Sequence, residues 1–307
     1  MREPQPSPAW FRRALERVPA DGEVKVEGAR IHYLRWGERG RPGIVFVHGG
    51  AAHAHWWSFI APLFVPEYRV AAIDLSGHGE SDRRAEYPRE LWAREVMAVA
   101  EDAGFDGPPI VVGHSMGGFV TIATAVEFGD RLAGAVILDS PVRRPDPEEE
   151  EGARGKAFRN PKVYPDVETA MQHFRTVPDQ PTSLPYVLDH VGRKSLRAVE
   201  GGVTWKFDPV IFRRATPRAT HELLADVGCR VALFRAENGL VTPDIGEYMY
   251  ELLGRNAPVI EIPEAHHHMM LDQPLLLVTG LRTLLADWEH SIPRGQRRGF
   301  EAGGARP

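Results

Sequence analysis

A serine lies in the sharp turn Gly113–Gly117, which reads GHSMG and has the pattern G-x-S-x-G. The apolar run Ile110–Val112 precedes this turn and the small, apolar run Gly118–Ala123 follows it, which predicts a strand, a turn and a helix. Glycines two positions before and after the serine let the strand and the helix pass closely. Such a turn lifts the hydroxyl into a cleft and points the amino end of the helix at it. We therefore predict that Ser115 is a nucleophile.

Short apolar runs alternate with helical stretches along most of the chain. This alternation predicts an α/β fold with a mostly parallel central sheet and helices on both faces. The runs expected to form strands are Ile44–Val47, Val70–Ile73, Ile110–Val112, Ala135–Leu138, Val231–Phe234 and Val259–Ile262. Before them we expect an amphipathic helix over Phe11–Val18 and a hairpin made of Val24–Val26 and Ile31–Leu34.

The rhythm of strands and helices breaks over residues 141–226, which is too long a stretch for an ordinary connection. It opens with the charged run Arg143–Glu151 and continues as helical segments broken by prolines, with no clear strand run. We expect a helical cap here, inserted between the two parts of a core domain, residues 1–140 and 227–292. The Gly- and Arg-rich tail, residues 293–307, has little to bury and is expected to be disordered.

Composition limits the partners and the compartment. The net charge of −5 gives no reason to expect nucleic acid as a partner, and no run approaches the roughly 18 apolar residues of a membrane helix. The one cysteine, Cys229, cannot form an internal disulfide, which fits a reducing compartment. We expect a cytoplasmic protein that binds a small molecule, and the oligomeric state is left open.

Three adjacent histidines, His266, His267 and His268, lie in the segment Glu264–Pro274. A serine hydroxyl needs a base to take its proton, and the base needs an acid to orient it. The segment follows the last predicted strand and so lies at the carboxyl edge of the sheet, where open α/β folds place their sites. We expect no metal at these histidines, because the side chains of consecutive residues splay apart.

Two backbone amides are candidates for an oxyanion hole. The segment Val47–Ala51 follows the first central strand and can offer the amide of Gly50, and Met116, which follows the serine, can offer the second amide. The glycines before Ala51 also suit a tight turn at the end of the strand, and this structural role is compatible with a role in the oxyanion hole. A second polar strand exit, Asp74–Asp82, is expected to pack and hydrogen-bond around this loop and to carry no chemistry.

Four segments together resemble the α/β-hydrolase fold superfamily, in its serine-nucleophile branch with a cap. They are HGG from His48, DLSGHGESD from Asp74, GHSMGG from Gly113 and HHHMMLDQP from His266, in the order of the family. In that family the catalytic histidine usually lies seven residues before the proline of the last motif, which implies His267. The resemblance implies chemistry carried by side chains and backbone amides, with no cofactor.

The chain departs from the family pattern at the acid. The family most often places an aspartate after the penultimate strand, where this chain has Gly239. Some members carry the acid after the strand that follows the nucleophile helix, and there this chain has Asp139. We predict Asp139 as the acid, with Glu237 and then Asp244 as alternatives. The other interpretation of Asp139 is a carboxylate that caps the entry to the insertion.

The residues and the resemblance together predict a serine hydrolase that cleaves an ester, thioester or lactone of a small, largely apolar substrate through an acyl-enzyme. A serine in place of an aspartate argues against epoxide hydrolase and haloalkane dehalogenase chemistry. Two alternatives stay open: a carbon–carbon bond hydrolase of a vinylogous diketone, and a ligand-binding member of the fold without catalysis. Candidates for an apolar pocket, or for plain core packing, are Trp56, Trp57, Trp205 and Phe207.

Overall fold

The computed structural model describes residues 7–144, 161–212 and 220–290, so the predicted tail and most of the acidic run lie outside the described residues. Its centre is an eight-stranded sheet with the order β1-β2-β4-β3-β5-β6-β9-β10. The strands are β1 Ala20–Val26, β2 Ala29–Trp36, β3 Gly43–Val47, β4 Arg69–Ile73, β5 Ile110–His114, β6 Gly134–Leu138, β9 Val231–Asn238 and β10 Val259–His266. Only the pairs β1–β2 and β2–β4 of this sheet are antiparallel. The predicted α/β class with a mostly parallel sheet is confirmed.

The central strands are apolar throughout because both faces of the sheet are covered. Every residue of β3, β4, β5 and β6 is buried, which explains why they read as continuous apolar runs with no alternation. In register, Val47 of β3 pairs with Gly113 of β5, and His114 pairs with Leu138 of β6. The residues that follow these strands therefore meet at one edge of the sheet.

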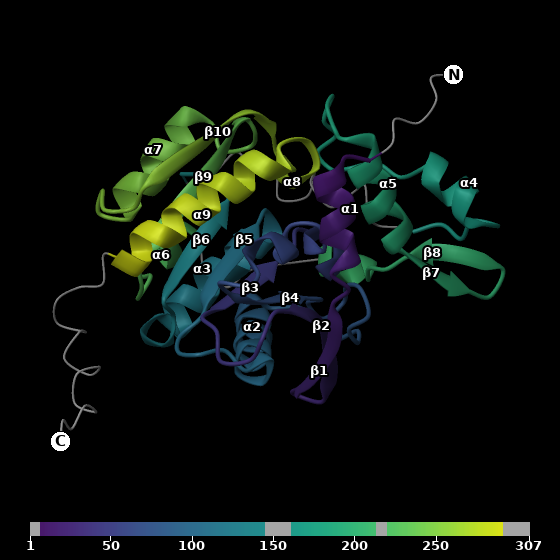
Figure 1. Cartoon of the computed structure of the whole chain (residues 1–307), viewed down its shortest axis with the longest axis horizontal. Helices are drawn as coiled ribbons and strands as arrows, with labels where there is room; N and C mark the ends of the chain where they lie inside the picture. The colour runs from purple at the N-terminus through teal and green to yellow at the C-terminus, as the bar shows by residue number, and fades with distance from the viewer. Residues whose placement is uncertain (1–6, 145–160, 213–219, 291–307) are drawn as a thin grey trace.

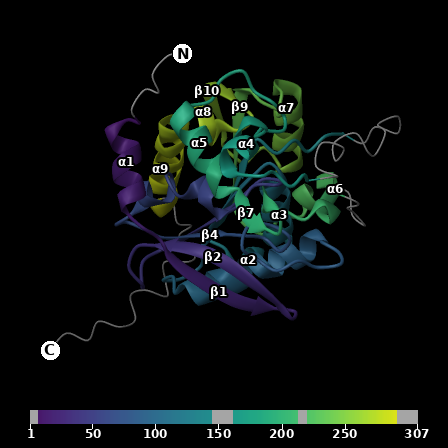
Figure 2. The ribbon, with the colours of Figure 1, turned by 90° about the vertical axis from the view of Figure 1, so that its right-hand side faces the viewer.

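Helices cover the two faces (Figures 1 and 2). One face carries α1 (Ala9–Glu16), α9 (Pro274–His290) and the 3-10 turns η1 (Ala54–Trp57) and η2 (Ala61–Phe64). The other carries α2 (Arg89–Ala103), α3 (Met116–Glu127), α6 (Thr220–Ala225) and α7 (Pro243–Leu252). The turn η3 (Gly129–Arg131) follows α3. None of the helices in the described ranges is long and apolar enough to cross a membrane.

The amino-terminal helix lies two residues earlier than predicted. It begins after Pro8, whose fixed φ suits the position before a helix, and it ends at Glu16. Arg17 already has a non-helical backbone (ψ 77°), because the chain turns there toward β1. Phe11 of this helix is buried in the core cluster and packs edge-on against Tyr186 with ring centroids 4.8 Å apart.

The inserted stretch contains a hairpin as well as helices. It holds α4 (Val167–Gln172), α5 (Pro185–Lys194) and η5 (Pro209–Phe212), which Figure 1 shows with the hairpin to one side of the main sheet. The hairpin pairs β7 (Leu196–Val199) with β8 (Gly202–Trp205), so the expectation of no strand here was wrong. Each strand is only four residues long, and Gly201 in the turn has a φ of 83°, which glycine adopts readily.

The insertion is tied to the loop that follows β4. The amide of Gly79 donates to the carbonyl of Lys206 (2.8 Å), and the amide of Asp208 donates to the carbonyl of Gly77 (2.7 Å). The Lys206 ammonium also pairs with the Glu80 carboxylate. These contacts fix the return of the chain from the hairpin onto the carboxyl edge of the sheet.

Candidate active site

Ser115 lies between the end of β5 and the start of α3, with φ 54° and ψ −119°. A non-glycine residue in so sparsely populated a region costs on the order of 1–3 kcal/mol, which the surrounding structure must supply. The turn requires glycine at position 113, because a Cβ there would overlap the carbonyl of Gly117. A Cβ at Gly117 would come within 2.5 Å of the carbonyl oxygens of Val47 and His48.

His267 lies after β10, just before α8 (Met269–Asp272), and its ring joins Ser115 to Asp139. Its Nε2 is 3.0 Å from Oγ of Ser115, and its Nδ1 is 2.8 Å from Oδ2 of Asp139. The backbone of His267 is held as well, because His114 Nε2 donates to its carbonyl oxygen at 2.8 Å. The structure thus brings a hydroxyl, an imidazole and a carboxylate into one line of hydrogen bonds.

Asp139 follows β6, is fully buried, and has a positive φ of 43°. Besides His267, its carboxylate accepts hydrogen bonds from the amides of Leu240 (2.8 Å), Val241 (3.2 Å) and Ala236 (3.3 Å). Burial by itself would raise the pKa of this carboxyl. The hydrogen bond and charge of His267 and the amides of Leu240 and Val241 outweigh burial and lower the pKa, so the group stays ionised.

The alternative acids face elsewhere. The Glu237 carboxylate accepts from the amide of Glu264 (2.7 Å), and the Asp244 carboxylate accepts from the hydroxyl of Thr242 (2.6 Å). A Cβ built on Gly239 would overlap the carboxylate of Asp139. The carboxylate that comes from β6 therefore occupies the space that a side chain at position 239 would need.

The two neighbours of His267 differ from each other. His266 Nδ1 lies 3.0 Å from Oδ2 of Asp272 and 3.0 Å from Oγ1 of Thr182, away from Ser115. His268 is buried, and its ring centroid lies 4.7 Å from that of His267. The His266 side chain thus splays away from its neighbours as expected, whereas the rings of His267 and His268 do not, so the reason we gave against a metal was wrong for that pair.

The loop after β3 lies against the serine. A Cβ on Gly49 would lie 3.3 Å from Cβ of Ser115, which places Gly50 beside the turn. His48 fixes this loop, because its Nδ1 donates to the Gly49 carbonyl (2.7 Å) and its Nε2 accepts from the Leu75 amide (3.2 Å). Within the described parts of the chain, no protein group accepts a hydrogen bond from the amides of Gly50 or Met116.

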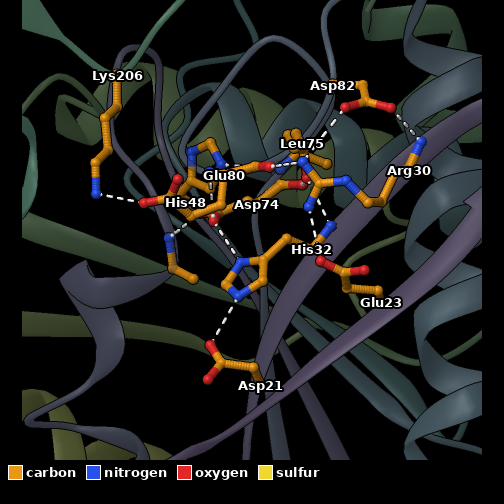
Figure 3. A network of polar contacts seen from close by, with 12 residues as sticks. Asp21, Glu23, Arg30, His32, His48, Asp74, Leu75, Glu80, Asp82 and Lys206 are labelled. Atoms are coloured by element: carbon orange, nitrogen blue, oxygen red, sulfur yellow. Dashed lines mark hydrogen bonds and ion pairs between the residues drawn. The ribbon is translucent and has the colours of Figure 1, made fainter. Parts of the chain in front are cut away.

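A buried carboxylate, Asp74, contacts both the same loop and the β1–β2 hairpin, and Figure 3 shows it beside His32 and His48. It accepts from His32 Nδ1 (2.8 Å), from the amide of Ala54 (2.6 Å) and from the amide of Glu80 (3.0 Å). His32 Nε2 lies 3.0 Å from Asp21 on β1. The sequence analysis assigned the Asp74 segment to packing but missed His32. This histidine lies in the β1–β2 hairpin at the edge of the sheet, in a segment with no recognisable motif.

We expect this network to make stability depend on pH. Burial by itself would lower the pKa of His32, but Asp74 and then Asp21 outweigh it and raise the pKa from 6.5 to about 8. A histidine whose pKa is higher in the folded than in the unfolded protein stabilises the fold fully at a pH below its unfolded pKa. This stabilisation is lost as the pH rises through its folded pKa. The free energy of unfolding should therefore fall by up to about 2 kcal/mol between pH 6 and about pH 9. Denaturant titrations should show a flatter profile for His32→Gln, and parallel profiles would contradict the assignment.

A cavity of about 360 Å³ opens beside Gly50, between the core and the insertion. Three of the four predicted aromatic side chains, Trp56, Trp205 and Phe207, line it. The fourth, Trp57, belongs to the core: it is fully buried and stacks on Phe46 with centroids 4.7 Å apart. The cavity wall is completed by residues of the insertion, among them Tyr164, Phe174, Val177 and Ser195.

A second serine–histidine pair, which the sequence did not single out, joins the insertion to the core. His53 Nε2 lies 2.8 Å from Oγ of Ser195, at the end of α5. The Ser195 hydroxyl donates to the Val191 carbonyl (2.7 Å), so it accepts from His53 and has no proton to give to that ring. This pair is a structural contact and is not an activated nucleophile.

The sheet, the strained serine turn and the hydrogen-bonded residues around it define a hydrolase of the α/β type. The sequence profile of the Alpha/beta hydrolase family matches residues 44–279. The chain belongs to this family.

Individual relatives match smaller parts of the chain. Epoxide hydrolase 4 from Homo sapiens is 28% identical over 121 residues, which cover 38% of this chain and 33% of that protein. Lipase LipV from Mycobacterium tuberculosis is 36% identical over 112 residues, 36% of this chain and 42% of that protein. The chain thus spans less than half the length of these relatives. The crystal structure of E-2-(acetamidomethylene)succinate hydrolase superposes with a TM-score of 0.75 at 18% identity, covering 87% of this chain and 99% of the other.

Proposed function

We propose that the protein is a serine hydrolase that cleaves an ester, thioester or lactone bond of a small molecule through an acyl-enzyme. The observation that carries this proposal is the line of contacts from Ser115 Oγ through His267 to Asp139, with distances of 3.0 and 2.8 Å. Ser115 stands where the chain turns from strand to helix, and each of its partners comes from the carboxyl end of a different strand. This is the placement that acyl transfer requires.

In the acylation step, Ser115 Oγ attacks the substrate carbonyl carbon while His267 Nε2 takes the hydroxyl proton. The carbonyl oxygen gains the negative charge, which the amides of Gly50 and Met116 stabilise. Asp139 accepts from His267 Nδ1–H, which keeps the lone pair on Nε2 and stabilises the imidazolium. When the carbon–oxygen or carbon–sulfur bond breaks, the imidazolium returns its proton to the leaving group.

In deacylation, His267 takes a proton from water, and the resulting hydroxide attacks the acyl carbon. Ser115 leaves and is reprotonated by the same ring, so the enzyme returns to its starting state. No step in this scheme calls for a cofactor.

The cavity supports a substrate with a largely apolar part. Trp56, Trp205 and Phe207 give it aromatic walls, and it meets the site at Gly50, while Ser115 and His267 lie outside its lining. An acyl or alcohol group held there while the carbonyl reaches past Gly50 to Ser115 would lose water contact on binding. The similarity to a lipase agrees with ester chemistry. The similarity to an epoxide hydrolase concerns the fold, because the nucleophile position here carries a hydroxyl and no carboxylate.

A panel of small p-nitrophenyl esters, a thioester, a lactone and a dienone diketone tests this function. We expect turnover of the acyl substrates and labelling of Ser115 by a fluorophosphonate. Turnover of the dienone alone would favour carbon–carbon bond hydrolysis. Labelling without turnover of any substrate would contradict the proposed activity and favour ligand binding.

The three adjacent histidines should respond very differently to substitution. His267→Ala should lose nearly all ester turnover, because no other ring lies within hydrogen-bond distance of Ser115 Oγ in the described residues. His266→Ala should keep substantial turnover, because that ring contacts Asp272 and Thr182 and lies away from the serine. His268→Ala should also retain turnover. Steady-state kcat values on one ester compare the three, and a near-normal His267→Ala would refute the assignment.

A further inference from the structure

Three histidines converge behind the serine: His114 from β5, and His267 and His268 from the loop after β10. One ring nitrogen from each lies within 4.8 Å of the others. The ring centroid of His114 lies 4.7 Å from that of His267 and 5.4 Å from that of His268. His267 has a part in the proposed reaction and His114 holds its backbone, but His268 has no role in either.

His268 is the unusual member of this trio. It is 6% exposed, and neither ring nitrogen makes a hydrogen bond of full geometry within the described residues, while the backbone of Val177 and Pro178 lies close enough to interact with the ring. The ring centroid lies 5.5 Å from that of Trp56. The backbone is held at both ends, because the amide donates to Oε1 of Gln180 (3.0 Å) and the carbonyl accepts from the amide of Leu271 (2.7 Å). A buried polar group without a partner costs roughly 1–3 kcal/mol, which a ligand that uses this nitrogen would recover.

The other two rings already have the outer contacts that metal-binding histidines require. Ligating histidines usually donate their second ring N–H to a carboxylate or a backbone carbonyl. His267 Nδ1 faces Asp139 at 2.8 Å, and His114 Nε2 donates to the His267 carbonyl at 2.8 Å. These contacts leave a lone pair on His114 Nδ1 and one on His267 Nε2, which now faces the Ser115 hydroxyl at 3.0 Å and would have to exchange that contact for a metal ion.

We propose that His114, His267 and His268 form an inhibitory site for a divalent transition metal such as Zn²⁺. Three neutral imidazoles suit Zn²⁺, which binds nitrogen at about 2.0–2.1 Å and leaves a fourth position open. Ligand nitrogens around such an ion lie roughly 3.3 Å apart, so the rings must close inward from their present spacing by small side-chain rotations.

Inhibition follows from the lone pair of His267. Its Nε2 is the atom that takes the Ser115 proton in the proposed function, on which this part of the inference rests. An ion bound at Nε2 occupies that lone pair, so the ring can no longer act as a base. Metal binding itself does not depend on the reaction.

The test uses the full-length protein freed of metal with a chelator. Zn²⁺ and Co²⁺ are added in increments while ester turnover is followed, and the visible absorption of Co²⁺ reports tetrahedral coordination independently of activity. We expect one equivalent to bind, turnover to fall in parallel, and chelator to restore it. His268→Phe, which keeps a ring against Trp56, should weaken binding at least tenfold. His290→Gln, at an exposed histidine at the end of α9 and outside the cavity, should behave as the unaltered protein.

The outcomes separate the site from the reaction. Absence of a Co²⁺ band in the unaltered protein, or equal inhibition of His268→Phe, would overturn the metal site. His268→Leu serves as the second variant if the phenylalanine variant fails to fold by circular dichroism. Ser115→Ala should still bind Co²⁺. If Co²⁺ binds through His268 but the metal-free protein turns over no acyl substrate, the proposed function fails and the metal site stands.

Discussion

Ser115→Ala should lower ester turnover by about 10⁶-fold and leave the fold intact, because loss of a serine nucleophile removes the acyl-enzyme route altogether. The substitution removes one oxygen atom from a half-buried side chain, so it creates no large cavity. The strained backbone at φ 54° is set by the packing of β5 and α3 and does not depend on the hydroxyl. The measurements are kcat on a p-nitrophenyl ester and the thermal midpoint of unfolding.

Ser195→Ala is the matched control, since the Ser195 hydroxyl also contacts a histidine ring and lies beside the cavity, whereas the Ser58 hydroxyl, which contacts His190, does not line it. The Ser195 hydroxyl donates a hydrogen bond to the Val191 carbonyl, so we expect kcat to stay near normal and any effect of the substitution to appear in KM. A fluorophosphonate should label the control and the unaltered protein but not Ser115→Ala. Loss of turnover in Ser195→Ala alone would move the nucleophile to the His53 pair and overturn our proposal.

The fold followed from local signals because its centre is unusually regular. The strands from β3 to β6 are buried on both faces, so their apolar runs could be found without any knowledge of their neighbours. The hairpin β7–β8 could not be found in this way, because each strand has only four residues and a mixed pattern of burial. A short edge element of this kind depends on tertiary contacts more than on its own sequence.

In the candidate site, too, residues fixed by local sequence could be predicted and residues brought together by tertiary packing could not. Ser115 could be predicted because its turn chemistry is local: two glycines permit the strained backbone between strand and helix. The choice between Asp139, Glu237 and Asp244 could not be made from the sequence, because the carboxylate that reaches His267 is the one 128 positions away, and only the packed sheet brings it there. The contact between His114 and His268 is likewise a consequence of packing, because no sequence motif that contains one of them predicts contact with the other.

Asp139→Asn should lower kcat by roughly 10⁴-fold, because an amide can neither hold the required imidazole tautomer nor stabilise the imidazolium. The three backbone amides that now donate to the carboxylate favour the charged form, so the neutral amide also loses part of their support. Glu237→Gln is the control, because that side chain contacts the Glu264 amide and not His267. A mild Asp139→Asn together with a severe Glu237→Gln would reassign the acid.

Moving the carboxylate to position 239 tests the geometry most directly. Gly239→Asp alone should be damaging, since its Cβ would overlap the Asp139 carboxylate and place two acids in one buried space. Asp139→Gly alone should lose the acid while relieving a backbone with φ 43°. The backbone of Gly239 is outside the left-handed region, so an aspartate fits there once the space is free.

The double variant, Asp139→Gly with Gly239→Asp, should therefore be more active and more stable than Gly239→Asp, and more active than Asp139→Gly. Its carboxylate would start from the neighbouring strand end and reach His267 Nδ1 from the side that Asp139 now occupies. Measured kcat and unfolding midpoints of the four proteins form a complete cycle. Additive losses in the double variant would mean that position 239 cannot orient His267. Recovery would show that this active site requires a carboxylate at one point in space, whichever strand supplies it.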